Sequence, residues 1–232
     1  MMRRFFVPSL GAAGATLTLP PAVRRHLAVL RLAPGEHVEL FDGSGQQARA
    51  RLEDDETVTI EALEEAHEPG PKLVLVQALP KGAKADEIVR MATELGVHAI
   101  HFVLTEHAVA RPDEGRGQKK TSRWQRIAEE AARQSERAIV PVVHAPLPLT
   151  KALGAVPTTD LRLVAWARGG VALGALPPAT DATWVAVGPE GGFSDAELDA
   201  FDRAGWTRYS LGPHVLRVDT AALAALSQLA TR

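Results

Sequence analysis

The 232-residue chain contains no cysteine. This absence excludes a disulfide framework, a metal site built from thiolates and a cysteine nucleophile. Long apolar runs are also missing, since none approaches the roughly 18 residues that a helix needs to cross a bilayer. The first residues, MMRRFFVPSL, contain two arginines that are not followed by the apolar region of a signal peptide. We therefore expect an ordinary cytosolic protein with a cytoplasmic location.

A strong excess of either charge is lacking as well. The net charge is −2 and the sequence pI is about 6.5, so the overall balance does not suggest a nucleic-acid-binding protein. Hydrophobic residues make up 46% of the chain and charged residues 23%, which excludes disordered and fibrous classes. A chain of this length forms one or two domains and buries a sizeable hydrophobic core without the help of disulfide bonds.

The charge is nevertheless distributed unevenly. Residues 1–52 contain seven arginines and three acidic residues, whereas residues 53–70 contain eight acidic residues and no lysine or arginine. Residues 111–137 contain eight basic and five acidic residues. Arginine outnumbers lysine by 20 to 6, and its guanidinium group suits phosphate recognition and base stacking. Each basic segment is therefore either a solvated surface or part of a nucleic-acid-binding surface.

The first seventy residues predict β-structure. Residues 36–41, 48–52 and 58–62 alternate between apolar and polar side chains, and turn-forming residues separate them. A period of two with such turns indicates a half-buried antiparallel sheet with hairpins. We expect a compact barrel here.

The pattern changes after the Pro-Gly-Pro segment at 69–71. An amphipathic stretch at 85–95 predicts a helix that stops at Gly96, and a second helix is expected with Ser122 as its N-cap and Trp124 on its apolar face. Strands that alternate with helices favour a parallel α/β sheet. The expected buried strands are four continuous apolar runs, at 73–79, 99–104, 161–166 and 184–187.

A glycine-rich loop, Gly188-Pro-Glu-Gly-Gly192, follows the last of these strands. Ser194 and Glu197 then form the pattern of a capping box at the start of a helix. Gly188, Gly191 and Gly192 remove side chains where a backbone approaches a ligand or adopts positive φ. The loop matches neither the dinucleotide nor the Walker pattern. It is either a ligand cradle at the carboxyl end of a strand or a tight strand-to-helix turn.

A second segment near the end of the chain repeats this arrangement. A short strand leads into a loop at 211–218, and Asp219 or Thr220 is expected to cap a terminal helix rich in alanine and leucine. Arg217 stands between apolar neighbours at the junction of loop and helix, an unusual place for a solvated arginine.

These two segments resemble the small-subunit ribosomal RNA methyltransferase E family of the SPOUT superfamily. The resemblance rests on Gly188-Pro-Glu-Gly-Gly192 followed by Leu211-Gly-x-x-x-Leu-Arg-x-Asp-Thr-Ala221, and it extends over essentially the whole chain. Further matches are Arg3-Arg-Phe-Phe-Val7, Lys81-Gly82, Glu94-Leu-Gly-Val97, Thr105-Glu-His-Ala-Val109 and Arg123-Trp124.

The chain departs from the family pattern at four places. The family has arginine where His107 and His214 stand, and glutamate where Asp219 stands. Its Glu-Gln-Cys-Gly-Arg stretch is replaced by Arg133-Gln-Ser-Glu-Arg137. Aspartate at position 219 keeps the negative charge, but its side chain is one methylene group shorter than that of glutamate, so the carboxylate lies closer to the backbone.

The resemblance implies methylation of N3 of one uridine near the 3′ end of small-subunit rRNA, with S-adenosyl-L-methionine as cofactor. It implies an α/β fold with two domains: an RNA-binding PUA-like β-barrel at 1–70 and a SPOUT methyltransferase domain at 71–232, whose parallel sheet ends in a trefoil knot. The expected partners are the rRNA or the assembled small subunit, and a second copy of the chain that completes the active site in a homodimer. No metal and no membrane are expected.

The resemblance also implies a set of site residues. Methyl transfer from a sulfonium needs positioning, and the uracil N3 proton has to leave, so a carboxylate or a cation that stabilises the developing anion is required. Arg217 and Asp219 are the expected catalytic residues. Expected RNA-binding residues are Arg3, Arg4, Arg24, Arg25 and Arg111. Expected cofactor-binding residues are Leu104, Thr105, Val187, Gly188, Pro189, Gly191, Gly192, Leu211, Gly212, Val215 and Leu216.

Two other functions fit the sequence. A related methyltransferase that acts on tRNA would keep the cofactor loops, and a non-catalytic RNA-binding protein would use the basic barrel while the glycine loops are only turns. A metal enzyme is disfavoured because the eight histidines are dispersed and no His-Glu-x-x-His pattern occurs. Ser194 does not lie in the G-x-S-x-G pattern of a nucleophile elbow.

Overall fold

A computed structural model describes residues 2–66, 68, 70–108, 114–178 and 181–231. Contacts divide the chain into two units. Unit 1 contains residues 1–69 and 129–140, and unit 2 contains residues 70–128 and 141–232. Within the described residues, no helix is both long and apolar enough to span a membrane.

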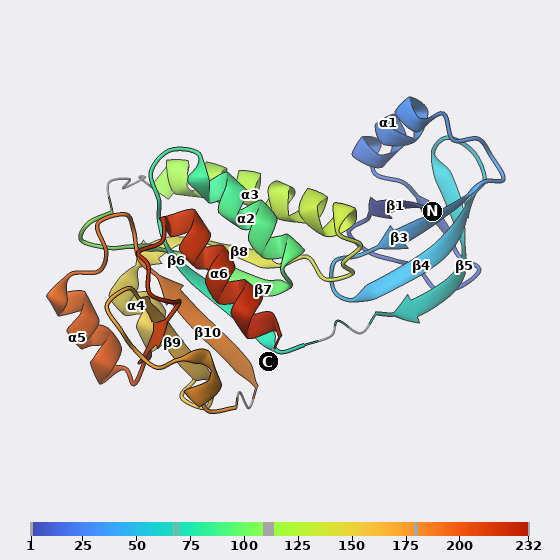
Figure 1. Cartoon of the computed structure of the whole chain (residues 1–232). Coiled ribbons are helices and arrows are strands. Elements are labelled where there is room, and N and C mark those ends of the chain that lie inside the picture. Colours follow the sequence, from blue (N-terminus) through green and yellow to red (C-terminus); the bar gives the residue numbers. More distant parts are fainter. Residues whose placement is uncertain (1, 67, 69, 109–113, 179–180, 232) are drawn as a thin grey trace. The chain divides into compact units, whose positions relative to one another are not determined.

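Unit 1 is a five-stranded sheet with one helix (Figure 1). Apolar residues that alternate along β3, β4 and β5 point into its core, where Val38, Leu40, Ala50 and Ile60 are fully buried. The strand order is β1-β3-β4-β5-β2; β1 pairs with β3 in parallel and the other pairs are antiparallel. The strands are β1 (Arg3–Phe6), β2 (Thr16–Thr18), β3 (His37–Phe41), β4 (Gln46–Leu52) and β5 (Thr57–Glu65).

Helix α1 (Pro21–Leu30) lies in the segment that was expected to be entirely β. Proline at its first position has the φ that a helix requires and needs no hydrogen bond there. Val23 and Leu27, four residues apart, are buried in the core of unit 1. Two such residues are too short a pattern for the sequence alone to predict the helix.

A distant part of the chain completes unit 1. Gly45 N–H donates to the carbonyl of Ala138, and Val140 N–H donates to the carbonyl of Gly43. The buried Arg137 guanidinium binds both carboxylate oxygens of Glu68 at 3.0 and 2.6 Å. Residues 129–140 therefore fold with the N-terminal sheet.

Unit 2 is built on a six-stranded sheet in the order β11-β9-β10-β6-β7-β8. All neighbouring strands are parallel, as the long apolar runs predict. Strand β8 begins after a Pro and has a partly exposed, proline-containing sequence, so it was not predicted. The strands are β6 (Lys72–Ala78), β7 (Val97–Leu104), β8 (Val142–Pro148), β9 (Leu161–Trp166), β10 (Ala182–Val187) and β11 (Thr207–Ser210).

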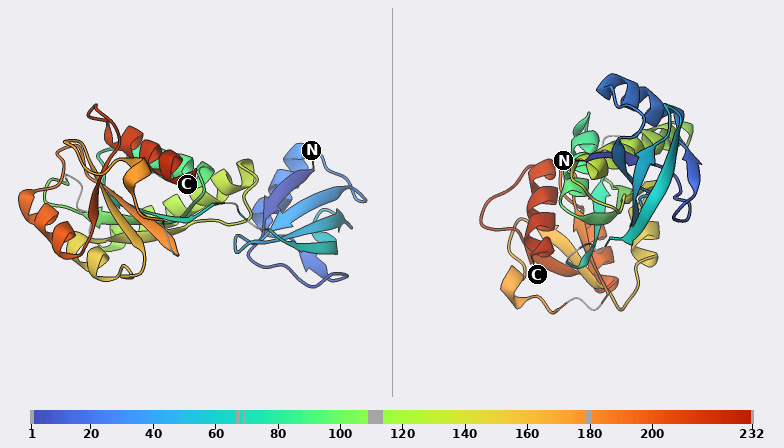
Figure 2. Two further views of the ribbon diagram at one scale, coloured as in Figure 1. Left: turned by 60° about the horizontal axis from the view of Figure 1, so that its bottom comes forward. Right: turned by 90° about the vertical axis from the view of Figure 1, so that its right-hand side faces the viewer.

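Helices cover both faces of this sheet (Figures 1 and 2). On one face lie α2 (Lys84–Glu94), α6 (Val218–Ala230) and the part of α3 (Glu114–Gln134) around Trp124, whose ring packs on Phe102 of β7. The other face packs against α4 (Leu149–Gly154) and α5 (Asp195–Arg203). A 3-10 turn, η1 (Leu173–Ala175), lies between β9 and β10.

Ser122 is not the N-cap of the second helix. It lies in the interior of α3, which begins eight residues earlier at Glu114, and its hydroxyl donates to the carbonyl of Gln118. Polar residues fill the first turns of this helix, so the apolar periodicity begins well after the helix does. Trp124 is buried, as predicted.

The connection between β9 and β10 runs outside β11. Val171 pairs with Tyr209 on the edge of β11 that faces away from β9, and two backbone hydrogen bonds join it to Arg208 and Ser210. The chain thus passes beyond β11 before it returns to β10 on the other side of β9. This is the path expected of a knotted C-terminal domain.

Candidate cofactor and RNA site

Four loops of unit 2 meet at one edge of the sheet. They follow β6, β7, β10 and β11, and because all four strands are parallel their carboxyl ends share that edge. Open α/β sheets bind their ligands there. The glycine-rich loop and the loop at 211–217 both belong to this group, so tertiary structure brings together the two segments that the sequence singled out.

The glycine-rich loop is a tight turn that enters a capped helix. Gly192 has φ +73° and its N–H donates to the carbonyl of Pro189 at 2.9 Å. A Cβ on Gly188 would lie 3.3 Å from the ring of Phe193. Ser194 and Glu197 form the predicted capping box, with both reciprocal hydrogen bonds present. Gly192 alone of the three glycines needs positive φ, whereas Gly188 and Gly191 are required for close packing.

The loop after β7 packs directly on this turn. The Nδ1 atom of His107 lies 3.1 Å from the carbonyl oxygen of Gly192, and a Cβ on Gly191 would lie 3.1 Å from the Cβ of His107. Glu197 accepts a hydrogen bond of 2.8 Å from the backbone N–H of Glu106. The capping glutamate therefore also holds two loops together.

Glu190, at the tip of the glycine-rich loop, is joined to the start of α2. Its carboxylate lies 3.2 Å from the ammonium of Lys84. Partial burial opposes ionisation, but hydrogen bonds from its own backbone, from Lys84 and from the backbone of Lys81 lower the pKa of Glu190. The carboxylate is thus ionised at neutral pH and links the loop to the start of α2.

Several polar atoms at this edge are shielded from solvent and have no hydrogen-bond partner in the described structure. They are Oε1 of Gln77, Oγ1 of Thr105 and Oδ1 of Asp219. Gln77 is fully buried at the end of β6, and its amide nitrogen donates to the carbonyls of Ala78 and Val187. Thr105 is 3% exposed at the end of β7. Buried polar atoms are almost always paired, so their free capacity marks a place for a polar ligand.

The loop at 211–217 is open to solvent. Gly212 has φ +122°, and Val215 is 82% exposed. Arg217, not Asp219 or Thr220, is the N-cap of α6; its backbone is extended and its side chain makes no capping hydrogen bond. Asp219 lies in the first turn of the helix. The predicted N-cap, Asp219 or Thr220, was therefore wrong by two or three residues, because the helix already begins at Val218.

Comparison with known proteins identifies the family of this chain. Residues 67–230 match the family described as an RNA methyltransferase domain, and residues 19–63 match an RNA methyltransferase PUA domain. The ribosomal RNA small subunit methyltransferase E of Synechocystis sp. is 38% identical over 93% of this chain and 73% of its own length. The corresponding protein of Mycobacterium bovis is 33% identical over 96% of this chain and 88% of its own length. The chain belongs to the ribosomal RNA small subunit methyltransferase E family.

Solved structures agree with this assignment. A family member from Neisseria gonorrhoeae, bound to S-adenosyl methionine, superposes with a TM-score of 0.93 at 32% identity and covers 100% of this chain and 98% of its own. A protein of Legionella pneumophila in complex with the same cofactor gives a TM-score of 0.90 at 31% identity, covering 99% and 97%. The family resemblance seen in the sequence is confirmed, and so is the predicted fold class of a parallel α/β methyltransferase domain with a PUA-like N-terminal domain.

The predicted RNA-binding arginines lie in unit 1, apart from Arg111, which is outside the described residues. Arg3 and Arg25 are exposed. Arg4 has a side chain only 9% exposed, which lies 2.8 Å from Glu39 and over the ring of Phe41. Arg24 forms an ion pair with Glu56 in the acidic segment. Arg4 and Arg24 are thus neutralised within unit 1.

Some candidate functional residues were not recognised from the sequence, because their roles depend on the residues that surround them in the folded protein. Gln77 is a polar residue inside the apolar run of β6, and that interruption is a signal in the sequence that a buried amide is present. Arg49 and Arg51 lie on the outer face of the unit 1 sheet and were counted only as part of the local charge, and His37 beside them was counted only among the dispersed histidines. No local pattern distinguishes them from other exposed basic residues.

Proposed function

We propose that this protein transfers a methyl group from S-adenosyl-L-methionine to N3 of a uridine in small-subunit rRNA. Family membership supports an rRNA methyltransferase. The cofactor is supported by the two related structures that contain it. One observation carries the proposal. The glycine-rich loop, the loop after β7 and the loop at 211–217 lie together at the carboxyl edge of the sheet. Beside them are polar atoms that are shielded from solvent and have no hydrogen-bond partner in the described structure.

The residues at this edge fit the proposed cofactor. Bound there, S-adenosyl-L-methionine supplies a methyl group on a positively charged sulfur. Gly188, Gly191 and Gly192 allow the backbone to approach a ligand closely, and Thr105 and Gln77 offer shielded hydrogen-bonding atoms. Apolar side chains would enclose the adenine. The proposed cofactor-binding set remains Leu104, Thr105, Val187, Gly188, Pro189, Gly191, Gly192, Leu211, Gly212, Val215 and Leu216, to which we add Gln77.

Arg217 and Asp219 are the proposed catalytic residues. Uracil must lose its N3 proton before the new N–C bond is complete, and until the methyl group arrives the negative charge is shared between N3 and the neighbouring carbonyl oxygens. Arg217 has an exposed position at the start of α6, where its cation can stabilise that charge. The carboxylate of Asp219 has one shielded oxygen without a partner among the described residues, so it can accept a proton or orient the arginine.

The proposed division of work follows the predicted domains. Residues 1–70 bind RNA and residues 71–232 hold the cofactor and carry out the transfer.

A homodimer is proposed because α6 is apolar on several sides: Ala222 and Leu226 are buried, whereas Leu223 on another face of the helix remains partly exposed. Because the proposed substrate is rRNA or the assembled small subunit, the proposed place of action is the cytoplasm. We propose no metal.

Nucleoside analysis tests the proposal directly. Purified protein is incubated with methyl-labelled S-adenosyl-L-methionine and, separately, with small ribosomal subunits, free small-subunit rRNA or tRNA. We expect 3-methyluridine in the rRNA and none in the tRNA. Label in the tRNA alone would support the tRNA enzyme instead. Calorimetry with the cofactor separates both enzymes from a non-catalytic RNA-binding protein, which would not bind it.

Substitution of the proposed catalytic pair tests their roles. We expect Asp219→Ala and Arg217→Ala to lower single-turnover methylation at least tenfold while cofactor affinity changes by less than about threefold, since each acts on the base. Arg217→Lys should restore part of the rate because it keeps the cation. A thermal melt measures stability in parallel. A normal methylation rate in Asp219→Ala would show that this carboxylate only stabilises the helix start.

A further inference from the structure

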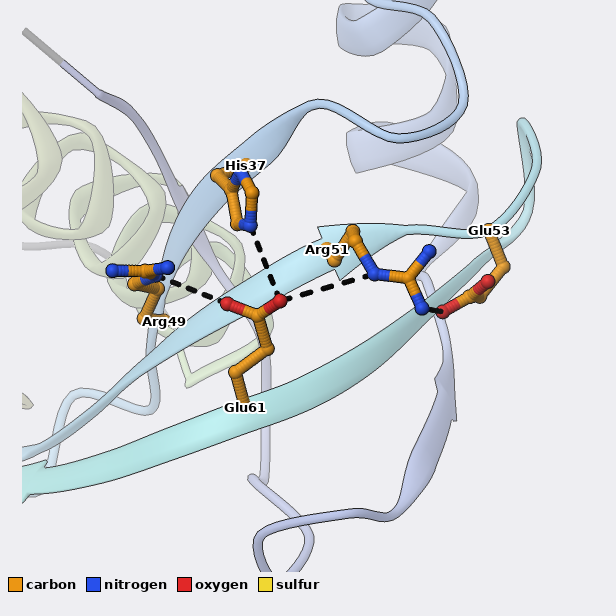
Figure 3. Close-up of polar contacts among 5 residues, drawn as sticks. All are labelled: His37, Arg49, Arg51, Glu53 and Glu61. Carbon is orange, nitrogen blue, oxygen red and sulfur yellow. Dashed lines mark hydrogen bonds and ion pairs between the residues drawn. The ribbon is translucent and has the colours of Figure 1, made fainter.

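Five charged or titratable residues form a continuous network on the outer face of the unit 1 sheet (Figure 3). We name this network the Glu61 cluster. It joins strands β3, β4 and β5 and the turn after β4, and its members are His37, Arg49, Arg51, Glu53 and Glu61.

Glu61 stands at the centre of the cluster. One carboxylate oxygen lies 3.1 Å from Nε2 of His37 and 3.8 Å from Nε of Arg51, and the other accepts a hydrogen bond of 3.0 Å from Nε of Arg49. Arg51 also binds Glu53 at 2.9 Å. Three nitrogen groups from two strands therefore converge on one carboxylate, as Figure 3 shows.

The cluster is accessible and adds nothing to the core. The side chains of Arg49, Arg51 and His37 are 57%, 43% and 39% exposed, and that of Glu61 is 29% exposed. The core lies on the opposite face of the same strands, where Ala50 and Ile60 are fully buried. Exposed ion pairs contribute little to stability because water already solvates both partners. Glu61 can therefore leave its partners at small cost.

The same donors suit a phosphodiester. Its anionic oxygens carry one negative charge, as a carboxylate does, and guanidinium groups bind both through charge-assisted hydrogen bonds. Partial desolvation opposes ionisation of Glu61, but hydrogen bonds and charge from His37 and Arg49 outweigh it and lower the pKa of the carboxyl. The site thus favours an anion over a neutral group.

We propose that the Glu61 cluster is a binding site for a backbone phosphate of the substrate RNA, in which Glu61 occupies the position of the phosphate until RNA displaces it. The inference rests on the proposed function and deepens it. All five residues lie within the segment 19–63 that matches an RNA methyltransferase PUA domain. They differ from the arginines that the sequence first suggested, of which Arg4 has a side chain only 9% exposed and bound to Glu39.

Displacement has a defined consequence for affinity. When a phosphate enters, Arg49, Arg51 and His37 exchange one anion for another, while Arg51 keeps its contact with Glu53. The carboxylate of Glu61 returns to water beside the bound phosphate and repels it. Glu61 therefore competes with RNA, and its neutralisation should strengthen binding more than the loss of any other negative charge on the same strand.

The test compares Glu61→Gln with a matched control, Glu64→Gln. Glu64 lies on the same strand and is exposed, and within the described residues it forms no ion pair. Binding of a labelled fragment from the 3′ region of small-subunit rRNA is measured over a range of salt concentrations. We expect Glu61→Gln to bind at least threefold more tightly than Glu64→Gln. Equal affinities of the two variants would overturn the proposal.

The basic side of the cluster is tested with Arg49→Gln/Arg51→Gln and with the matched lysine pair. Removal of both cations should weaken RNA binding about tenfold and reduce the slope of log affinity against log salt by about 1 to 2. The lysine pair should keep the slope and lose only part of the affinity. An unchanged slope in a folded glutamine variant, checked by circular dichroism, contradicts a phosphate site here.

Methylation by the wild-type protein, measured in the same series, keeps the two proposals apart. If the wild type forms 3-methyluridine but the variants do not follow the expected order, the phosphate site is wrong and the function stands. If no methyl group is transferred but Glu61→Gln still binds RNA more tightly than Glu64→Gln, the site stands and the function is wrong.

Discussion

Glu136 has φ +60°, a conformation that glycine adopts readily and other residues avoid. It follows α3, where the N–H of Ser135 and Arg137 bind carbonyls of the last helical turn. This left-handed residue closes the helix, and glycine is the usual choice there. The Glu-Gln-Cys-Gly-Arg stretch of the family that the sequence resembles has glycine at this position, so glutamate introduces local strain that glycine would avoid.

We therefore expect Glu136→Gly to raise the free energy of unfolding by about 0.5–1 kcal/mol, since the strain of a Cβ in the left-handed region exceeds the entropy that glycine loses. Urea denaturation measures the change. Glu136→Ala is the control: it removes the same charge but keeps the Cβ, so it should give no gain. Equal stabilisation by alanine and glycine would assign the effect to charge instead.

Gly191 is constrained by its neighbour and not by its φ angle. Because a Cβ there would lie 3.1 Å from the Cβ of His107, Gly191→Val should push the glycine-rich loop away from the loop after β7. We expect cofactor affinity to fall at least tenfold while unit 2 stays folded. Gly154→Val at the end of α4, where a Cβ meets no atom within 4 Å, should leave that affinity unchanged. Calorimetric titration measures both.

At the scale of elements, a buried ion pair fastens the segment after α3 to the end of the N-terminal sheet. Arg137 and Glu68 have side chains only 8% and 14% exposed, and Glu68 also accepts a hydrogen bond from the N–H of Ile139. Removing one partner of such a pair leaves the other charge buried without compensation. The pair therefore decides whether residues 129–140 remain packed within unit 1.

We expect Arg137→Met to reduce the free energy of unfolding by about 3 kcal/mol, within the range for a broken buried pair. The double variant Arg137→Met/Glu68→Met should be more stable than this single variant because no charge remains unpaired. A double-mutant cycle with urea denaturation gives the coupling energy. Simple additivity of the two changes would mean that the ion pair does not contribute as a unit.

Helices and strands could be predicted from the sequence where the apolar pattern lies within the element itself. The runs at 73–79, 99–104 and 161–166 became β6, β7 and β9, and Gly96 ends its helix with φ +87° as predicted. The capping box at Ser194 was also visible locally. Helix α1 and strand β8 were missed because packing by distant parts of the chain stabilises them, and neither has a long periodic pattern of its own.

At the scale of the whole molecule, a stacked histidine pair makes stability depend on pH. The rings of His101 and His144 lie 3.9 Å apart, beside Trp184. Burial, and then the charge of His144, lower the pKa of His101 to about 4; burial also lowers the pKa of His144. In the unfolded chain a histidine has a pKa near 6.5. Below that value the unfolded state binds more protons, so acid favours unfolding.

We therefore expect the free energy of unfolding to fall by about 1–2 kcal/mol from these histidines between pH 6.5 and pH 4, a value reduced because water partly screens the rings. His101→Gln should flatten this part of the pH profile. Urea denaturation at several pH values compares the slopes of the wild type and the variant, and identical slopes would exclude the stacked pair as the cause.

The sequence by itself determined the two-part organisation, the alternation of strands and helices in the second part, and the two glycine-containing loops with their family resemblance. These depend on periodicity and on residue types at fixed spacing, which are local properties. Tertiary structure alone decided that His107 packs on Gly191, that Arg24 is neutralised by Glu56, and that three nitrogen groups converge on Glu61. The first two contacts join residues that are far apart in the chain, and the third joins three strands of one sheet. Their positions follow from strand order and register, which the cooperative packing of the whole core sets and no short segment encodes.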